Sequence, residues 1–238
     1  DARDQKKIEK ETLELLTKYG IPFYPKSEIE GCEGIREVKK VLIRIKKNQI
    51  IKIKTSMLCV SGGFNPDIHL FTQSKGLLKW DENLLTFKPD RIFQNTITLG
   101  SVSGNFDFKK LLNEVEKKLN LFEGLNELDI KFEINGPEKF EIKELWETKN
   151  AKKSFWSKSF IDLQNDVTTK DLRQAVNEGF DRIEHLKRFT TNSMGTDQGK
   201  ISSINALGIV SKILKKNISE VGTTTYRPPY SPVNFSAI

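Results

Sequence analysis

Residues 160–200 read FIDLQNDVTTKDLRQAVNEGFDRIEHLKRFTTNSMGTDQGK, and this stretch decides how the chain is interpreted. Thr168 is followed three residues later by Asp171, the spacing of a capping box whose side chains satisfy amides of the first helical turn. Apolar residues then recur at the helical period, and they are Leu172, Ala175, Val176 and Phe180. We predict a helix that ends at Gly179, a shorter helix over 181–189 and a polar turn over 190–200.

A third helix is predicted after this turn, over residues 201–216. Its apolar residues occur on several sides, which indicates burial, and lysines at its carboxyl end complement the helix dipole. The prolines around Arg227 exclude a helix from residues 221–233 and favour an extended segment that lies along a partner surface.

The first 119 residues predict part of a doubly wound, nucleotide-binding α/β domain. An amphipathic helix over 6–19 leads to a short strand over 21–24, and the alternating pattern of 38–45 and 49–54 predicts a hairpin. Residues 55–60 contain the apolar run MLCV, which is typical of a central parallel strand. Gly62 and Gly63 follow it, where the backbone of such sheets approaches a nucleotide, although a tight turn explains the pair equally well.

A second phosphate-friendly arrangement is predicted further along. A strand over 92–100, a turn of small residues over 100–104 and a helix over 106–119 would present free amides at the helix amino terminus. No G-x-G-x-x-G occurs in the sequence. Residues 120–159 show no sustained period and are interpreted as a connecting region.

Composition narrows the class of protein. The formal net charge of the 238 residues is +7, but lysines alternate with glutamates instead of forming one basic face, so we do not predict nucleic-acid binding. No apolar run is long enough to cross a bilayer, and no membrane contact is predicted. Cys32 and Cys59 suggest neither a disulfide nor a metal site, and a reducing cytoplasm is the expected location. The start at Asp1 indicates a piece of a longer protein.

Five runs in this order resemble the alpha subunit of heterotetrameric sarcosine oxidase. They are SGGFNPDIHLFTQSKGLLKWDE (61–82), FIDLQNDVTTKDLRQAVNEGF (160–180), HLKRFTTNSMGTDQGK (185–200), NALGIVSKIL (205–214) and VGTTTYRPPYSPV (221–233). The resemblance implies a complex that demethylates sarcosine to glycine with oxygen, releases hydrogen peroxide and passes the one-carbon unit to tetrahydrofolate. It also implies NAD on the alpha subunit, FAD in the beta subunit and FMN at the contact between them. The partners would be the beta subunit and smaller subunits, and no catalytic residue is expected in this chain.

The same resemblance assigns residues to these roles. Asp1 matches the acidic residue that binds an adenosine ribose, while Gly100-Ser101 departs from the Gly-Asp that holds a flavin in related enzymes. Residues 162–202 resemble a [2Fe-2S]-binding helical domain of related dehydrogenases, and its four cysteine positions are here Asp162, Gln164, Asp197 and Ser202. Because iron–sulfur clusters need thiolates, we interpret this as a small all-α domain that has lost its cluster.

Five residues are candidates for the contact near FMN, because hydroxyl, amide and cationic groups suit phosphate and flavin oxygens. They are Thr190, Thr191, Gln198, Lys200 and Arg227. The alternative is that these groups cap helices and satisfy the backbone.

The expected organisation has four parts. They are part of a pyridine-nucleotide-binding domain (1–119), the connecting region (120–159), the helical domain (160–220) and a linker toward an aminomethyltransferase-like folate-binding domain (221–238). Two other functions stay open. One is an alpha-type subunit of another amine, proline or opine dehydrogenase, and the other is a non-catalytic nucleotide-binding subunit.

Overall fold

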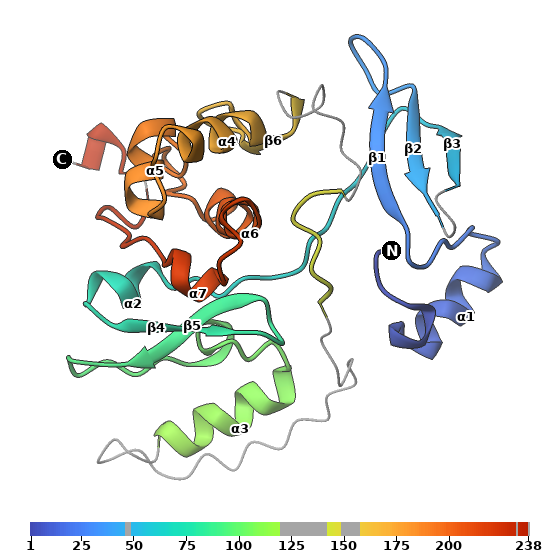
Figure 1. The fold of residues 1–238 in the computed structure, drawn as a ribbon. Helices are drawn as coiled ribbons and strands as arrows, with labels where there is room; N and C mark the ends of the chain where they lie inside the picture. The colour runs from blue at the N-terminus through green and yellow to red at the C-terminus, as the bar shows by residue number, and fades with distance from the viewer. Residues whose placement is uncertain (46–48, 120–141, 149–157, 232, 238) are drawn as a thin grey trace. The chain divides into compact units, whose positions relative to one another are not determined.

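The computed structural model describes residues 1–45, 49–119, 142–148, 158–231 and 233–237. The chain divides into two compact units, of which the first comprises Asp1–Phe64 with Glu141–Lys152 and the second Asn65–Phe140 with Lys153–Ile238. Helices and strands both occur, as predicted for an α/β chain (Figure 1). Every pair of strands that the described residues form is antiparallel, so this part of the chain contains no doubly wound parallel sheet.

The first unit contains a three-stranded sheet and short helices (Figure 1). Its elements are η1 (Gln5–Lys7), α1 (Lys10–Lys18), β1 (Glu28–Glu33), β2 (Lys40–Arg44) and β3 (Ile50–Lys54). The predicted hairpin is confirmed as β2 and β3, in which buried Val41 pairs with Ile53. Strand β1 was not predicted, and it contains Cys32, which pairs with Val41 of β2.

The two strands predicted at 21–24 and 55–60 are also wrong. Residues 21–24 have no regular structure. The Thr55 hydroxyl donates to the Met57 carbonyl and accepts from the Met57 amide, and both contacts belong to a local turn. Met57 and Val60 are 71% and 74% exposed. An apolar run becomes a central strand only where neighbouring strands pair with it, and the described residues provide none here.

The second unit begins with a short helix and a hairpin. Its elements are α2 (His69–Gln73), β4 (Leu77–Asp81), β5 (Thr86–Arg91), η3 (Gly100–Ser103) and α3 (Phe108–Leu119). Helix α3 was predicted. The strand predicted over 92–100 is wrong, because pairing takes place upstream, where Trp80 faces Phe87 across the hairpin.

The rest of the second unit is mostly helical. Its elements are β6 (Phe160–Asp162), β7 (Val167–Thr168), α4 (Thr169–Asn177), α5 (Ile183–Thr190), α6 (Ser202–Leu214), α7 (Ile218–Val221) and η5 (Phe235–Ala237). The predicted capping box is confirmed, since the Thr168 amide donates to Asp171 Oδ2 at 2.8 Å. Helix α4 packs against α5 and α6 (Figure 1). Leu172, Leu186 and Val210 of these helices are fully buried. Most of the predicted connecting region, 120–159, lies outside the described residues.

Candidate functional site

The four positions that resemble cluster ligands lie around one loop region and bond to the protein itself. Asp162, 2% exposed, accepts hydrogen bonds from three backbone amides. Its Oδ1 accepts from Gln164 at 2.9 Å and Asn165 at 3.1 Å, while its Oδ2 accepts from Ser193 at 2.7 Å. This carboxylate therefore joins the loop after β6 to the turn before α6.

Gln164 and Asp197 form the next part of this network. The Gln164 Oε1 accepts from the Thr196 hydroxyl and the Asp197 amide, both at 3.2 Å. A Cβ on Gly195 would lie 2.1 Å from the same Oε1, so only glycine leaves room for this side chain. The Asp197 carboxylate accepts from the amide of Gly199 at 3.1 Å.

Ser202 completes the set in a buried serine cluster. Its Oγ lies 2.9 Å from the Oγ of Ser193, which also accepts from Ser203 at 3.0 Å. No group of three or more His, Cys, Asp or Glu among the described residues could hold a metal ion. The four side chains thus make hydrogen bonds where the resembling domain has thiolates.

A cavity of about 390 Å³ opens beside this network, and we call it the cationic cavity. It is lined by Glu184, Lys187, Arg188, Ser193, Met194, Gly195, Thr196, Gln198, Arg227, Pro228 and Pro229. Three of these side chains are cationic and one is a carboxylate, so the lining carries a net positive charge.

The charges in the cationic cavity influence one another. Burial lowers the pKa of Lys187, the nearby Glu184 opposes this shift, and the positive charges of Arg227 and Arg188 lower the pKa further. Glu184 is already engaged, because it lies 3.4 Å from Arg188 and accepts from the Thr225 amide at 3.1 Å. The cavity is therefore suited to an anion.

Gln198 fixes the segment that carries Arg227. Its Oε1 accepts from the Arg227 amide at 3.1 Å, and its Nε2 donates to the Pro229 carbonyl at 2.5 Å. The side-chain amide thus bonds the backbone on both sides of Pro228 and positions it at the edge of the cavity.

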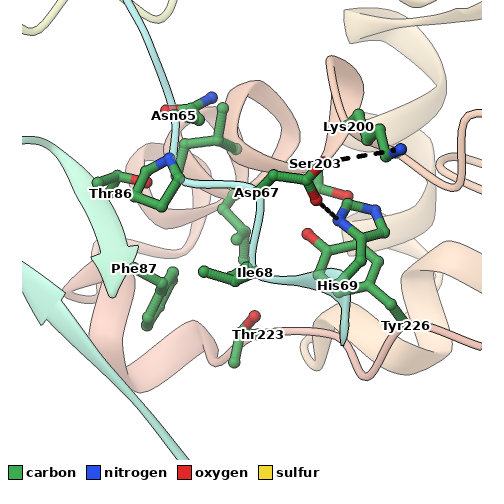
Figure 2. A pocket seen from close by; sticks show the side chains of 14 residues that line it. Asn65, Asp67, Ile68, His69, Thr86, Phe87, Lys200, Ser203, Thr223 and Tyr226 are labelled. Carbon is green, nitrogen blue, oxygen red and sulfur yellow. Dashed lines mark ion pairs between the residues drawn. The ribbon is translucent and has the colours of Figure 1, made fainter. Parts of the chain in front are cut away.

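A second cavity of about 210 Å³, the aspartate cavity, lies within the same unit. Figure 2 shows Asp67 between Lys200 and His69, with Ile68, Phe87 and Thr223 around the same space. The Asp67 carboxylate lies 2.9 Å from His69 Nδ1 and 3.8 Å from Lys200 Nζ. It also accepts from the Tyr230 hydroxyl at 2.6 Å.

Two aromatic rings complete the surroundings of this carboxylate. The His69 ring stacks on Tyr226 with centroids 3.6 Å apart, and Lys200 Nζ lies 4.1 Å from the Tyr230 ring centroid. Burial lowers the pKa of His69 against the opposing effect of Asp67, so the imidazole is neutral near pH 7. Burial would raise the pKa of Asp67, but the Tyr230 hydrogen bond and the charges nearby outweigh it and lower that pKa.

The structure separates the five residues predicted near FMN. Gln198 and Arg227 line the cationic cavity, whereas Lys200 lines the aspartate cavity. The hydroxyl of Thr190 donates to the Leu186 carbonyl, and that of Thr191 to the Thr190 carbonyl, the contacts expected of the capping alternative.

The residues predicted for NAD belong to the first unit. The Asp1 carboxylate accepts from the amide and guanidinium of Arg3 at 2.8–3.1 Å, contacts that compete with a ribose. Gly62 and Gly63 lie in an exposed segment without regular structure, where Gly63 has a φ of 107°. These residues do not by themselves form a dinucleotide site.

The predicted phosphate-friendly turn at 100–104 is satisfied from within the second unit. The Glu114 carboxylate accepts from the Gly100 amide at 3.4 Å, and Asp107 accepts from the first amides of α3, those of Lys109 and Lys110. Two carboxylates at these amides disfavour a phosphate.

Sequence reasoning missed three residues that line the two cavities and one that bonds to the lining. The lining residues are Asp67, Lys187 and Arg188, and Tyr230 bonds to Asp67. Lys187 and Arg188 resemble ordinary charges of an exposed helix face. Asp67 and Tyr230 lie within two of the five runs that resemble the sarcosine oxidase alpha subunit. Their location in these runs was the available sign of a functional role.

Comparisons with known proteins address the same region. Residues 156–238 match the family model of the sarcosine oxidase A3 domain. The sarcosine oxidase subunit alpha of Corynebacterium sp. (strain P-1) is 32% identical over 194 residues, 79% of this chain and 20% of that protein. The subunit of the same name from Rhizobium meliloti (strain 1021) is 34% identical over 193 residues, 78% of this chain and 19% of that protein.

The chain is a relative of sarcosine oxidase alpha subunits. The resemblance inferred from the sequence is confirmed, and the matched A3 domain contains the cationic cavity. This relative spans about a fifth of the length of the curated alpha subunits it matches.

A solved structure shares the fold of this sarcosine oxidase relative. The crystal structure of L-proline dehydrogenase from P. horikoshii matches with a TM-score of 0.61 and 22% identity, covering 95% of this chain and 47% of that chain. At this identity the likeness concerns the fold alone. Among the described residues, no helix combines the length and apolar character needed to cross a membrane.

Proposed function

We propose that this chain is a segment of the alpha subunit of a flavin-dependent sarcosine oxidase. The complex would convert sarcosine and oxygen to glycine and hydrogen peroxide and transfer the one-carbon unit to tetrahydrofolate. The segment would contribute to nucleotide binding and to the contact with a flavin-bearing beta subunit. FAD would lie in that partner, FMN at the contact, and tetrahydrofolate in a domain beyond this segment.

The cationic cavity carries this proposal. It lies in the A3-like region and places Lys187, Arg188 and Arg227 around one space with a single opposing carboxylate. Phosphate groups favour guanidinium and ammonium partners, so the lining fits the phosphate of a mononucleotide. Bound there, the flavin would supply electron transfer, while the chain would bind and orient it.

Individual residues of the cavity would have distinct tasks. Arg227 would donate to the phosphate, because no ion pair to a protein carboxylate holds it among the described residues. Lys187 would add a second positive charge. Gln198 would act by holding the Arg227 backbone, and Lys200 would contribute through its contacts with Asp67 and Tyr230.

The nucleotide part of the proposal rests on fewer contacts. Asp1, Gly62 and Gly63 would provide some of an NAD site, completed by residues outside this segment. We assign no reaction step to NAD. The free thiols of Cys32 and Cys59 are both exposed, which supports a reducing cytoplasm.

The decisive test replaces Arg227 by Met in the assembled complex and measures the bound FMN. Loss of one charge-assisted contact should weaken FMN binding about tenfold. Arg182→Met is the matched control, because Arg182 is an exposed arginine of the same unit outside the cavity lining. If both variants retain FMN as the parent complex does, the flavin assignment is wrong.

The reaction needs a separate measurement. The complex should consume oxygen and release hydrogen peroxide with sarcosine but not with proline or opines. Turnover only with proline or an opine would support the dehydrogenase alternative. Absence of turnover with retained nucleotide would support a non-catalytic binding subunit.

A further inference from the structure

The half-exposed carboxylate of Asp67 contacts the segment Tyr226–Tyr230, which we call the exit arm. Asp67 accepts from the Tyr230 hydroxyl at 2.6 Å, across 163 positions of sequence. Lys200 binds the same pair, since its Nζ lies 3.8 Å from Asp67 Oδ2 and 4.1 Å from the Tyr230 ring centroid. These contacts hold the carboxyl end of the exit arm.

His69 holds the other end of the exit arm. Its ring is 3% exposed and stacks at 3.6 Å on Tyr226, which is 8% exposed. The Asp67 Oδ1 lies 2.9 Å from Nδ1 of this imidazole. The short helix α2, which begins at His69, therefore contacts the exit arm on both sides of Arg227.

Arg227 is left as the residue between these two fixed ends. Tyr226 lines the aspartate cavity and Tyr230 bonds to Asp67, whereas Arg227, Pro228 and Pro229 line the cationic cavity. Gln198 bonds the Arg227 amide and the Pro229 carbonyl, so the middle of the exit arm is fixed as well. A change at Asp67 would reach the cationic cavity through the exit arm without altering the charge of its lining.

We propose that Asp67 and His69 are a positioning pair that presents Arg227 to the anionic group bound in the cationic cavity. Neither residue lines the cationic cavity, and the pair acts through Tyr226, Tyr230 and the hydrogen bond of His69 with the backbone of Gln198. This inference rests on the proposed function, because it takes the ligand to be the phosphate of a flavin mononucleotide. The affinity of the cationic cavity for the phosphate would then depend on Asp67, a carboxylate of the aspartate cavity.

The test compares two ligands that differ by the phosphate alone. Binding of flavin mononucleotide and of riboflavin is measured in the assembled complex after removal of its flavin, for the parent, Asp67→Asn, Tyr230→Phe and Arg227→Met. Asp67→Asn and Arg227→Met should each weaken flavin mononucleotide about tenfold, the scale of one charge-assisted hydrogen bond, and change riboflavin less than about twofold. Asp67→Glu, which keeps the carboxylate, should recover part of the affinity.

Matched controls isolate the two contacts. Asp90→Asn removes an exposed carboxylate elsewhere in the same unit, and Tyr19→Phe removes the hydroxyl of a 67% exposed tyrosine. Both should bind the two ligands as the parent does. Tyr230→Phe should show the phosphate-selective loss of Asp67→Asn, because it removes the other partner of the same hydrogen bond.

Each other outcome contradicts a defined part of the reasoning. Selective loss in Arg227→Met but not in Asp67→Asn would overturn the positioning role and leave the proposed function intact. Equal loss of both ligands in Asp67→Asn would show that the carboxylate only maintains the fold. Unchanged ligand binding in both variants would overturn the proposed function itself.

Discussion

Replacing Asp162 by Ala tests how strongly its hydrogen bonds stabilise the A3-like domain. The carboxylate accepts from the amides of Gln164, Asn165 and Ser193, and its side chain is almost fully buried. A hydrogen bond to a charged group contributes about 1.5–3 kcal/mol, and a buried amide without a partner costs about 1–3 kcal/mol. Since water can reach part of the site after truncation, we expect a net loss of about 3–5 kcal/mol in local stability.

The assay is hydrogen exchange of the full-length protein, followed in peptides that cover 160–205. A loss of 3–5 kcal/mol corresponds to exchange that is roughly 100- to 4,000-fold faster, since each 1.4 kcal/mol is about tenfold. Asp162→Asn should lie in between, because its carbonyl oxygen can keep the Oδ1 contacts and loses the Ser193 amide. Glu178→Ala, at an exposed position in the same unit, should change stability by less than about 0.5 kcal/mol. Exchange in Asp162→Ala no faster than in this control would refute the reasoning.

Two further predictions concern packing and pH. Gly199→Ala should destabilise the helical region by about 3 kcal/mol in hydrogen exchange, because its φ is 77° and a Cβ would lie 2.2 Å from Ser203 Oγ. Gly179→Ala, with a φ of 95° and nothing within 4 Å, should cost about 1 kcal/mol, and equal costs would contradict the steric explanation. For His69→Phe, urea unfolding at pH 7 and pH 5 should show less pH dependence than the parent. His69 has a lowered pKa when folded, so below its unfolded value of about 6.5 the unfolded state binds more protons and the parent loses stability as pH falls. An unchanged difference between the two pH values would contradict this origin.

Local patterns of sequence predicted the helical region well. Helix α4 has its capping box and its apolar stripe within about ten residues, so neighbours along the chain determine it. The hairpin of β2 and β3 was predicted for the same reason, since its alternation and turn are contiguous.

The failures share a dependence on distant partners. The run at 57–60 has the composition of a buried strand, but composition does not supply the strands that must pair with it. The contact of Asp67 with Tyr230 spans 163 positions, and no spacing rule connects two such residues. Gln198 and Arg227 were identified through the family resemblance, and only the structure showed that they meet Lys187 and Arg188 in one cavity.

The network around Asp162 has a consequence for how this domain can evolve. A single change of Asp162, Gln164 or Ser202 to Cys would break established hydrogen bonds, and one thiolate cannot hold an iron–sulfur cluster. Each such single change would thus lower stability without gaining a redox centre. Successive single mutations therefore do not lead to a cluster without a loss of stability, and descendants of this chain are expected to vary the polar network instead.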